Sequence, residues 1–419
     1  MPQAPKGTRD IIGEDYQAFR YIIDTAERVI GSTGAVHIET PVFEETAVFE
    51  KAVGASTDIV RKEMYTFTDR GGRSLTLRPE GTAGIVRAYL ENGMKVWPQP
   101  VRLYTYGPMF RAENVQRGRY RQFHQIDYEA IGSADPLVDA EAIALLVKIL
   151  QELGLTGLEV KLGSVGDPED RKQYNAYLRG LLSPSLERLS KDSKDRLELN
   201  PMRILDSKDQ KDQVLLKELG ARPMLDFLGP EAKRHFEDLQ KYLKALGVNF
   251  SIDPSIVRGL DYYVRTAFEV HHARIGAQSA LCGGGRYDGL AEMLGGPHVP
   301  GVGWAFGIER IAIAMEEEGF SPSAEAGPDL LIVPLDEKAR EEALALAQQL
   351  RPKFRVEFLY TTKSPRKGLE DALKRQATFV AFLGEAERSK GVVTLKHLAR
   401  GSQEEVYAQE LAAKLGARI

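Results

Sequence analysis

The sequence contains little of what several protein classes require. Only one of its 419 residues is a cysteine, Cys282, which excludes a disulfide framework, a zinc finger and a thioredoxin-type pair. No apolar run approaches the roughly 18–20 residues that a membrane span needs. The first residues lack an apolar signal segment, so we expect a cytoplasmic protein without membrane association.

Common nucleotide-binding and hydrolase motifs are also missing. The sequence holds no GxxxxGK[ST] loop, no GxGxxG after a strand, and neither HExxH nor GxSxG. With seven histidines and one cysteine, we predict no metal site built from protein side chains. The adjacent His271 and His272 lie on a predicted strand, where they would face opposite sides and could not chelate one ion together.

Net charge is close to balance. The chain has 56 Lys and Arg against 60 Asp and Glu, a net charge of −4, which excludes a uniformly basic nucleic-acid-binding protein but not a local basic surface. Residues 327–419 hold 16 Lys and Arg against 13 Asp and Glu, whereas the preceding 326 residues have an acidic excess. The C-terminal part is therefore mildly basic.

The patterns of apolar, charged and turn-forming residues divide the chain into several parts. Residues 1–165 and 251–320 mix strand and helix patterns, including an amphipathic helix over 16–30 and another over 139–154. Residues 166–250 are densely charged and almost purely helical, which suggests an inserted subdomain. The small, polar stretch 321–327 is typical of a linker, and residues 328–419 alternate strands and helices as a compact α/β unit.

Two predicted strands and an arginine-rich loop occupy residues 106–132. Alternation places Phe123, Gln125, Asp127 and Glu129 on one face of the second strand, opposite a face that can pack in a core. A polar face indicates either a solvated edge strand or a polar pocket. The loop favours the pocket, because guanidinium groups suit phosphate recognition; its arginines are Arg111, Arg117, Arg119 and Arg121.

Four other segments each allow a structural and a functional interpretation. In LTLRPEGTAG, Thr82 is a plausible helix N-cap, and Glu80 could bind an ammonium group or simply belong to a helix start. Glycines 283–285 favour a tight turn or bulge, or they allow the backbone to approach a ligand or another strand closely. Arg310 lies in the first turn of a predicted helix, where an anionic partner would explain it. The segment SIVRGLDYYVRT places Arg258 just before two tyrosines and a strand.

In this order, the segments resemble a class II aminoacyl-tRNA synthetase. IETPVFEETAVFEKAVG resembles motif 1, FRAENVQRGRYRQFHQIDYEAIG motif 2, and GVGWAFGIERIAIAM motif 3. RGLDYYVRT and CGGGRYDGL are similar to the two signature peptides of the histidyl-tRNA synthetase family. The resemblance extends over essentially the whole chain.

The resemblance implies a fold and a reaction. The fold is α+β: an antiparallel-sheet catalytic domain with a helical insertion, followed by a C-terminal α/β anticodon-binding domain. The reaction joins L-histidine and ATP into histidyl-adenylate, with Mg²⁺ held largely by ATP oxygens, and then transfers histidine to the 3′ end of tRNA(His). The resemblance also implies a homodimer with motif 1 at the interface.

Roles follow from the resemblance at matching positions. Arg111 and Arg258 are the expected catalytic residues, both directed at the α-phosphate, and Arg310 is expected on the γ-phosphate. Phe123 would stack on adenine. The implied ATP-binding residues are Arg111, Glu113, Phe123, Arg258 and Arg310. The implied histidine-binding residues are Glu80, Gly81, Thr82, Arg111, Gln125, Glu129, Arg258, Tyr262, Tyr263 and Tyr287.

One alternative remains at this point. Regulatory paralogues of the family bind histidine and control ATP phosphoribosyltransferase, but they typically lack an anticodon domain and have lost ATP-binding residues. Arg111, Arg258 and Arg310 are all present here, as is a separate C-terminal unit. The sequence therefore favours the enzyme over the regulatory subunit.

Overall fold

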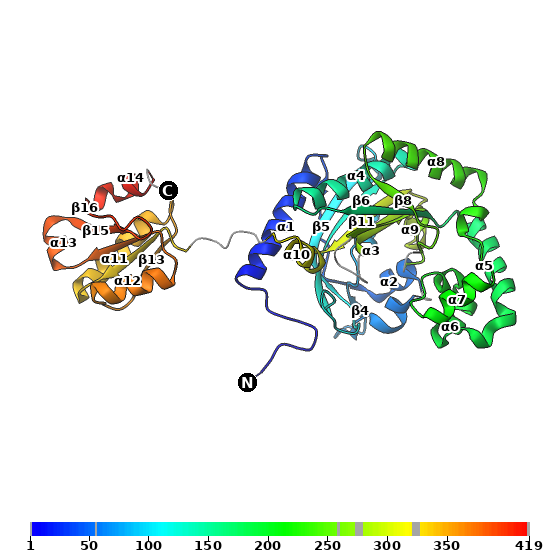
Figure 1. The fold of residues 1–419 in the computed structure, drawn as a ribbon, viewed down its shortest axis with the longest axis horizontal. Coiled ribbons are helices and arrows are strands. Elements are labelled where there is room, and N and C mark those ends of the chain that lie inside the picture. The colour runs from blue at the N-terminus through cyan, green and yellow to red at the C-terminus, as the bar shows by residue number, and fades with distance from the viewer. Residues whose placement is uncertain (1, 55–56, 258–259, 273–279, 321–326, 417–419) are drawn as a thin grey trace. The chain divides into compact units, whose positions relative to one another are not determined.

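The chain forms two compact units, residues 1–322 and 323–419. The computed structural model shown in Figure 1 describes residues 2–54, 57–257, 260–272, 280–320 and 327–416. Arg258 and all of the predicted linker except residue 327 lie outside the described residues. No helix in the described ranges is both long enough and apolar enough to cross a membrane.

The first unit is built on an eight-stranded sheet with the order β1-β5-β6-β11-β10-β9-β7-β8. The six strands from β5 to β7 in this order pair antiparallel, whereas β1 and β8 pair parallel at the two edges. This is the antiparallel sheet that the resemblance implies. The strands are β1 (Val36–His37), β5 (Val101–Phe110), β6 (Gln122–Ile131), β7 (Leu158–Ser164), β8 (Phe250–Ile252), β9 (Val264–His272), β10 (Ala280–Arg286) and β11 (Gly301–Gly307).

Helices α1 (Glu14–Gly31), α4 (Pro136–Glu152), α8 (Pro230–Ala245) and α10 (Ile308–Glu317) pack around one face of this sheet. The apolar face predicted for residues 16–30 is buried in α1, and the helix ends at Gly31 as expected. The predicted amphipathic pattern of α4 is wrong in one respect. This helix is buried on most sides, because it packs against the sheet, α1 and α8 together.

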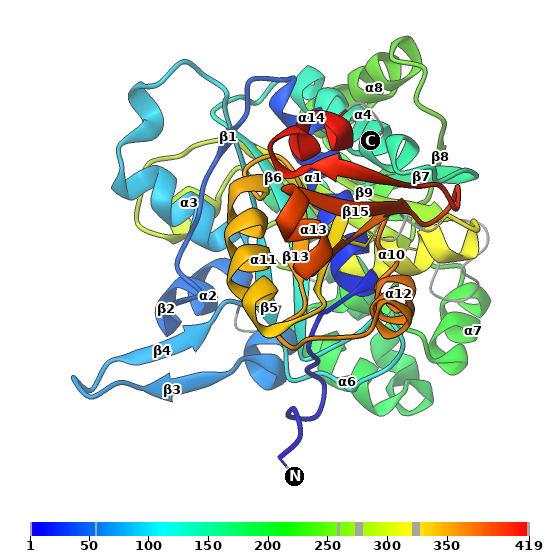
Figure 2. The ribbon, with the colours of Figure 1, turned by 90° about the vertical axis from the view of Figure 1, so that its left-hand side faces the viewer.

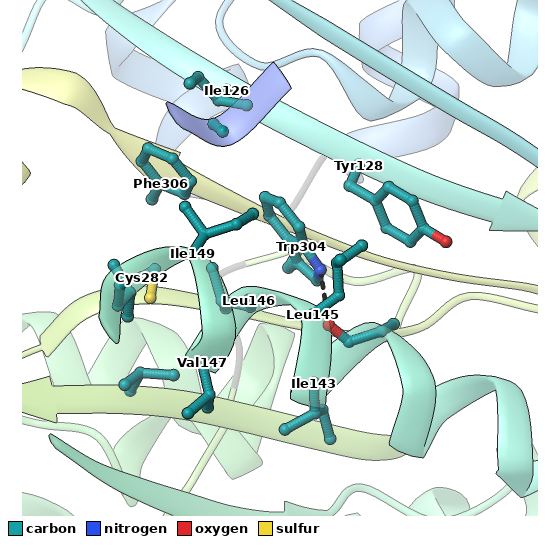
Figure 3. Close-up of a cluster of buried hydrophobic side chains, with 14 of the residues drawn as sticks. Ile126, Tyr128, Ile143, Leu145, Leu146, Val147, Ile149, Cys282, Trp304 and Phe306 are labelled. Carbon is teal, nitrogen blue, oxygen red and sulfur yellow. Dashed lines mark hydrogen bonds between the residues drawn. The ribbon is translucent and has the colours of Figure 1, made fainter. Parts of the chain in front are cut away.

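An aromatic stack lies at the centre of the core. Trp304 on β11 stacks with Tyr128 on β6 and with Phe306, at ring-centroid distances of 5.3 and 5.8 Å. Its indole N–H donates to the carbonyl of Ala142 on α4 over 2.8 Å, the dashed contact in Figure 3. The apolar face predicted for β6 therefore packs in the core, because Ile126 and Tyr128 belong to this cluster.

The remaining parts of the first unit lie beside the large sheet. A three-stranded sheet of order β2-β4-β3 forms an arm (Figure 2), and the predicted helical stretch is indeed helical; its boundaries as a domain stay a prediction. These elements are β2 (Phe43–Glu45), α2 (Thr46–Val53), η1 (Ile59–Glu63), β3 (Thr66–Thr68), β4 (Ser74–Leu77), α3 (Thr82–Glu91), η2 (Met94–Val96), α5 (Pro168–Leu182), η3 (Ser183–Arg188), α6 (Lys191–Leu199), η4 (Pro201–Ile204), α7 (Gln210–Glu218), η5 (Met224–Phe227) and α9 (Leu290–Met293).

The second unit is an α/β domain with a five-stranded sheet of order β13-β12-β14-β15-β16. Strands β13, β12 and β14 are parallel, and β15 and β16 continue antiparallel. This confirms the alternating pattern predicted for residues 328–419. The elements are β12 (Leu330–Pro334), α11 (Glu337–Leu350), β13 (Val356–Phe358), α12 (Pro365–Lys374), β14 (Phe379–Leu383), α13 (Glu385–Lys390), β15 (Val392–His397), β16 (Gln403–Tyr407), η7 (Ala408–Glu410) and α14 (Leu411–Gly416).

The glycine run at residues 283–285 is not a tight turn, and it instead shows the close approach to another strand that the sequence also allows. It lies within β10, between β11 and β9, with register shifts beside Cys282 and Gly285. A Cβ on Gly284 would lie 2.1 Å from the carbonyl oxygen of Gly303, so only glycine fits between these strands. The missing signal was the partner strand, which is 20 residues away in sequence.

We expect Gly284→Ala to destabilise the first unit by about 1–3 kcal/mol, because the added methyl group must push β10 from β11. Gly180→Ala is the matched control, since a Cβ there meets nothing within 4 Å and alanine favours the helix α5. Urea unfolding followed by tryptophan fluorescence reports on the first unit alone, because Trp97 and Trp304 are the only tryptophans. Unchanged stability of the Gly284 variant would contradict this packing.

Candidate active site

A cavity of about 350 Å³ opens on the face of the sheet opposite the aromatic stack. Phe123, Gln125, Asp127 and Glu129 line it from β6, as the alternation predicts. Of the predicted site residues that the structure describes, all but Gly81 line this cavity. Gly81 lies directly behind it, where a Cβ would come within 2.8 Å of the Asp127 carboxyl carbon. Arg258 lies outside the described residues.

Three buried carboxyl groups form one end of the cavity: Glu80, Asp127 and Glu129. Burial raises the pKa of Glu80 and raises that of Glu129 well above its usual range. Burial, and then the nearby Glu80, raise the pKa of Asp127 to about 7. Desolvation disfavours the charged form of each group, and a cation bound at this end of the cavity would favour that form again.

The turn before α3 is organised by Glu80 rather than by Thr82. The Glu80 carboxylate accepts hydrogen bonds from the backbone N–H groups of Thr82 and Ala83, both at 2.9 Å. The N-cap is Gly81, so the predicted capping role of Thr82 is wrong. Because Glu80 satisfies the free N–H groups of the helix, the Thr82 hydroxyl is available to bond elsewhere.

Glu129 joins three separate segments. It accepts a hydrogen bond from the Thr82 hydroxyl at 2.6 Å and another from the Tyr287 hydroxyl. Its side chain fits only because residue 303 is glycine, where a Cβ would lie 1.7 Å from Glu129 Oε2. Burial raises the pKa of Tyr262 and Tyr287, so both hydroxyls remain donors.

Two buried acceptors in the cavity have no partner among the described residues: Gln125 Oε1 and Asp127 Oδ2. They sit two positions apart on the same face of β6. An unmade hydrogen bond at a buried polar atom is costly, so such atoms point to a missing ligand group. An ammonium group, which donates up to three hydrogen bonds, matches this pair of acceptors.

The rest of the cavity carries arginines and an aromatic ring, although the carboxyl groups of Glu113, Glu269 and the buried Glu309 also line it. The guanidinium of Arg111 lies 5.1 Å from the Phe123 ring centroid, while its Nε donates to the carbonyl of Pro79 at 2.8 Å. Arg310 donates to the carbonyl of Ala280 at 2.7 Å, which turns it from the helix start toward the cavity. Burial, and then Arg119, lower the pKa of Arg310, so an anion there would be favourable.

The arginine side chains of the loop at residues 111–121 lie in different places. Arg111 and Arg119 line the cavity, and Arg119 pairs with Glu113 at 3.3 Å. Arg117 instead pairs with Glu316 and Glu317 on the surface of α10. Arg121 donates to the backbone carbonyl of Glu113 at 3.4 Å. Sequence alone could not tell these four arginines apart.

A buried ion-pair network supports Tyr287, and sequence reasoning missed it. Arg286 is fully buried and bonds Asp139 on α4, with a further contact to Asp288 at 2.9 Å. His235 on α8 joins the network through its contact to Asp139 at 3.4 Å, and it also contacts the Thr266 hydroxyl at 3.1 Å. The network joins β10, α4 and α8 directly behind the cavity. An arginine beside a glycine run was the one available signal.

Across the described ranges, no group of three or more His, Cys, Asp or Glu residues is arranged to hold a metal ion. His271 pairs with Glu269, whereas His272 on the opposite face pairs with Glu318, each at 2.9 Å.

Comparisons with known proteins agree with this geometry. Residues 7–311 match the family model described as histidyl-tRNA synthetase, and residues 329–418 match an anticodon-binding domain. The histidine–tRNA ligase of Thermus thermophilus is 63% identical, over 99% of this chain and 98% of the relative. That of Deinococcus radiodurans is 55% identical over 99% of each chain. The crystal structure of apo histidyl-tRNA synthetase from S. aureus has a TM-score of 0.83 at 37% identity, covering 99% of this chain and 100% of that one.

The match of one family model to most of the first unit, the anticodon-binding match in the second, and full-length relatives above 50% identity lead to one conclusion: the chain belongs to the histidyl-tRNA synthetase family.

Proposed function

We propose that the chain activates L-histidine with ATP and transfers the histidyl group to tRNA(His). The observation that carries this proposal is one cavity with buried carboxyl groups at one end and arginines with an aromatic ring at the other. Histidine brings an ammonium group and an imidazole, and ATP brings phosphates and a purine. Each end of the cavity complements one substrate.

At the acidic end, we assign the amino group of histidine to Glu80, Thr82 and Gln125. Gly81 keeps the turn close to the pocket, since no side chain fits there. Glu129 and the tyrosines Tyr262, Tyr263 and Tyr287 surround the imidazole. A site that hydrogen-bonds a polar side chain rejects apolar side chains of similar size, because its own polar groups would be left unpaired.

At the cationic end, we assign Arg111 to the α-phosphate and the substrate carboxylate, and Arg310 to the γ-phosphate. Phe123 stacks on adenine, and Glu113 contributes to ATP binding. Arg258 takes the second position at the α-phosphate by resemblance. Attack of a carboxylate on phosphorus requires positioning and neutralisation of growing negative charge, which fixed guanidinium groups provide.

Mg²⁺ is the expected companion of ATP. The carboxylates of Glu113 and Glu269 line the cavity, but the described residues form no cage of three or more ligands. This donor set fits a Mg²⁺ ion that takes most of its ligands from phosphate oxygens and water, as the ion commonly does. When bound, the ion would neutralise phosphate charge.

The second unit supports tRNA as the acceptor. Its match to an anticodon-binding domain favours the enzyme over a regulatory subunit of ATP phosphoribosyltransferase, which typically lacks this domain. The unit is also the mildly basic part of the chain. We place the activity in the cytoplasm.

We expect ATP–pyrophosphate exchange to depend on histidine alone among the twenty amino acids, because the acidic end binds both its ammonium group and its imidazole. The measurement is exchange of labelled pyrophosphate into ATP with each amino acid in turn. Exchange with none of them would favour the regulatory function, and exchange with another amino acid would contradict the assignment of the pocket.

We expect Glu129→Gln to lower kcat/KM for histidine in the exchange assay by about 100-fold, because the amide nitrogen is a donor and cannot accept a hydrogen bond as the carboxyl oxygen in its place does. Glutamine has the shape of the protonated carboxyl group, so the fold should survive. Glu237→Gln, on the exposed side of α8, is the control for loss of one carboxylate and should leave kcat/KM unchanged. Equal activity of both variants would exclude Glu129 from substrate binding.

A homodimer through the motif 1 segment accounts for exposed apolar side chains near the small sheet. Val36, Val42, Phe43 and Phe67 are all more than one-third exposed, and the rings of Phe43 and Phe67 lie 6.2 Å apart. Such apolar side chains grouped on one surface mark an interaction site. Of these residues, Val42 and Phe43 lie in the motif 1 segment, residues 38–54, that the resemblance assigns to the interface.

We therefore expect a solution mass of roughly 93 kDa by light scattering, twice the 46.5 kDa of one chain. Phe43→Glu should shift the mass toward the monomer, since a charge would be buried in the interface. Tyr360→Glu, at an exposed aromatic residue of the second unit, is the matched control. A monomeric wild-type chain, or a Phe43 variant that remains dimeric, would contradict this interface.

A further inference from the structure

Asp127 lines the cavity, yet neither the sequence motifs nor the roles assigned above use it. We propose that Asp127 is a third acidic residue of the amino-acid pocket, with its Oδ2 atom accepting a hydrogen bond from the charged amino group of the substrate. The inference rests on the proposed function and extends it to a residue that sets substrate affinity.

The geometry of β6 aims Asp127 at the substrate position. Its side chain lies on the same face as those of Gln125 and Glu129, and only 1% of the residue is exposed. Among the described residues, Asp127 Oδ2 has no hydrogen-bond partner, and neither has Gln125 Oε1. Two buried acceptors on one strand face, both lining one cavity, form a site for a donor with several N–H groups.

The guanidinium group of Arg78 forms its hydrogen bonds with residues other than Asp127. Its Nε donates to the carbonyl of Pro108 at 2.9 Å, and its Nη1 donates to the carbonyl and hydroxyl of Thr40 at 3.0 and 3.2 Å. The positive charge of Arg78 therefore acts on Asp127 only from a distance. The Oδ2 atom of Asp127 therefore remains available to bind a second cation.

Charged groups face Asp127 from each neighbouring segment. Glu80 in the turn before α3 opposes its ionisation, whereas Arg78 after β4 and Arg111 after β5 favour it. Glu129 lies two positions along β6, and the backbone N–H of Gly81 donates to the Asp127 carboxylate. On β5, the directly opposite residue is the uncharged Thr105. The two acidic and two basic groups therefore have opposing effects on the ionisation of Asp127. An incoming ammonium group shifts Asp127 toward its ionised form.

This arrangement has a defined pH dependence. The pKa of Asp127 is raised to about 7 in the folded chain, so the group is mostly protonated at pH 6 and mostly ionised at pH 8. Only the ionised form attracts an ammonium group strongly. The contribution of Asp127 to substrate affinity should therefore increase with pH across this interval.

The test is calorimetric binding to the full-length chain with Asp127→Asn, which keeps the shape of the carboxyl group and removes its charge. The probes are histidine, histidinol (no carboxylate) and imidazolepropionate (no amino group). At pH 8 we expect the variant to bind histidine and histidinol about 10- to 100-fold more weakly than wild type does, with imidazolepropionate unaffected. Asp10→Asn, at an exposed position, should leave the affinities for all three unchanged.

At pH 6, the ratio of variant to wild-type affinity for histidine should move toward one. Free histidine also titrates over this pH range, but its titration affects both proteins equally and cancels in the ratio. Equal weakening of all three probes would show a structural role and overturn the proposal, as would a ratio that does not change with pH. Failure of wild type to bind histidine would instead overturn the proposed function. The two failures are therefore distinguishable.

Discussion

The burial of three carboxyl groups at one end of the cavity is the constraint on which the site depends. Glu80, Asp127 and Glu129 have lost water, and the fold compensates each in a different way. Glu80 binds the N–H groups of a helix start, Glu129 receives two hydroxyl donors, and Asp127 retains an oxygen without a partner among the described residues. A buried charge is costly unless it is paired, so the cavity is complete only when a cation enters it.

The sheet makes this arrangement rigid. Gln125, Asp127 and Glu129 on β6 alternate with residues that pack in the core: Ile126, Tyr128 and Ala130. The packing of Tyr128 against Trp304 therefore holds the strand that carries Asp127 and Glu129. Glycines in β10 and β11 let the strands and the Glu129 side chain approach closely. The buried pair of Arg286 and Asp139 fixes the strand end that presents Tyr287. The cavity is therefore shaped before any substrate binds.

Local sequence patterns predicted much of the site, whereas the features that depend on contacts between distant residues were not predicted. Alternation along β6 correctly separated the polar face of Gln125 from the core face of Tyr128, because strand periodicity is a local property. The strand conformation of the glycines in β10 depends on β9 and β11, and the bond from Thr82 to Glu129 joins residues 47 positions apart. A single sequence carries no record of such pairings. The resemblance named most of the site. Alternation already placed Asp127 on the pocket face of its strand, but a role for it emerged only from its burial and from an acceptor atom without a partner among the described residues.

The most direct measurement of the central claim is the number of protons exchanged when histidine binds at pH 7, obtained by calorimetry in buffers of different ionisation enthalpy. If the cavity carboxyl groups ionise to receive the ammonium group, wild type should release more protons than Asp127→Asn. With a pKa of about 7 for the free carboxyl group, the difference should be roughly half a proton. Equal proton exchange in the two chains would contradict the claim that the buried carboxyl groups await a cation.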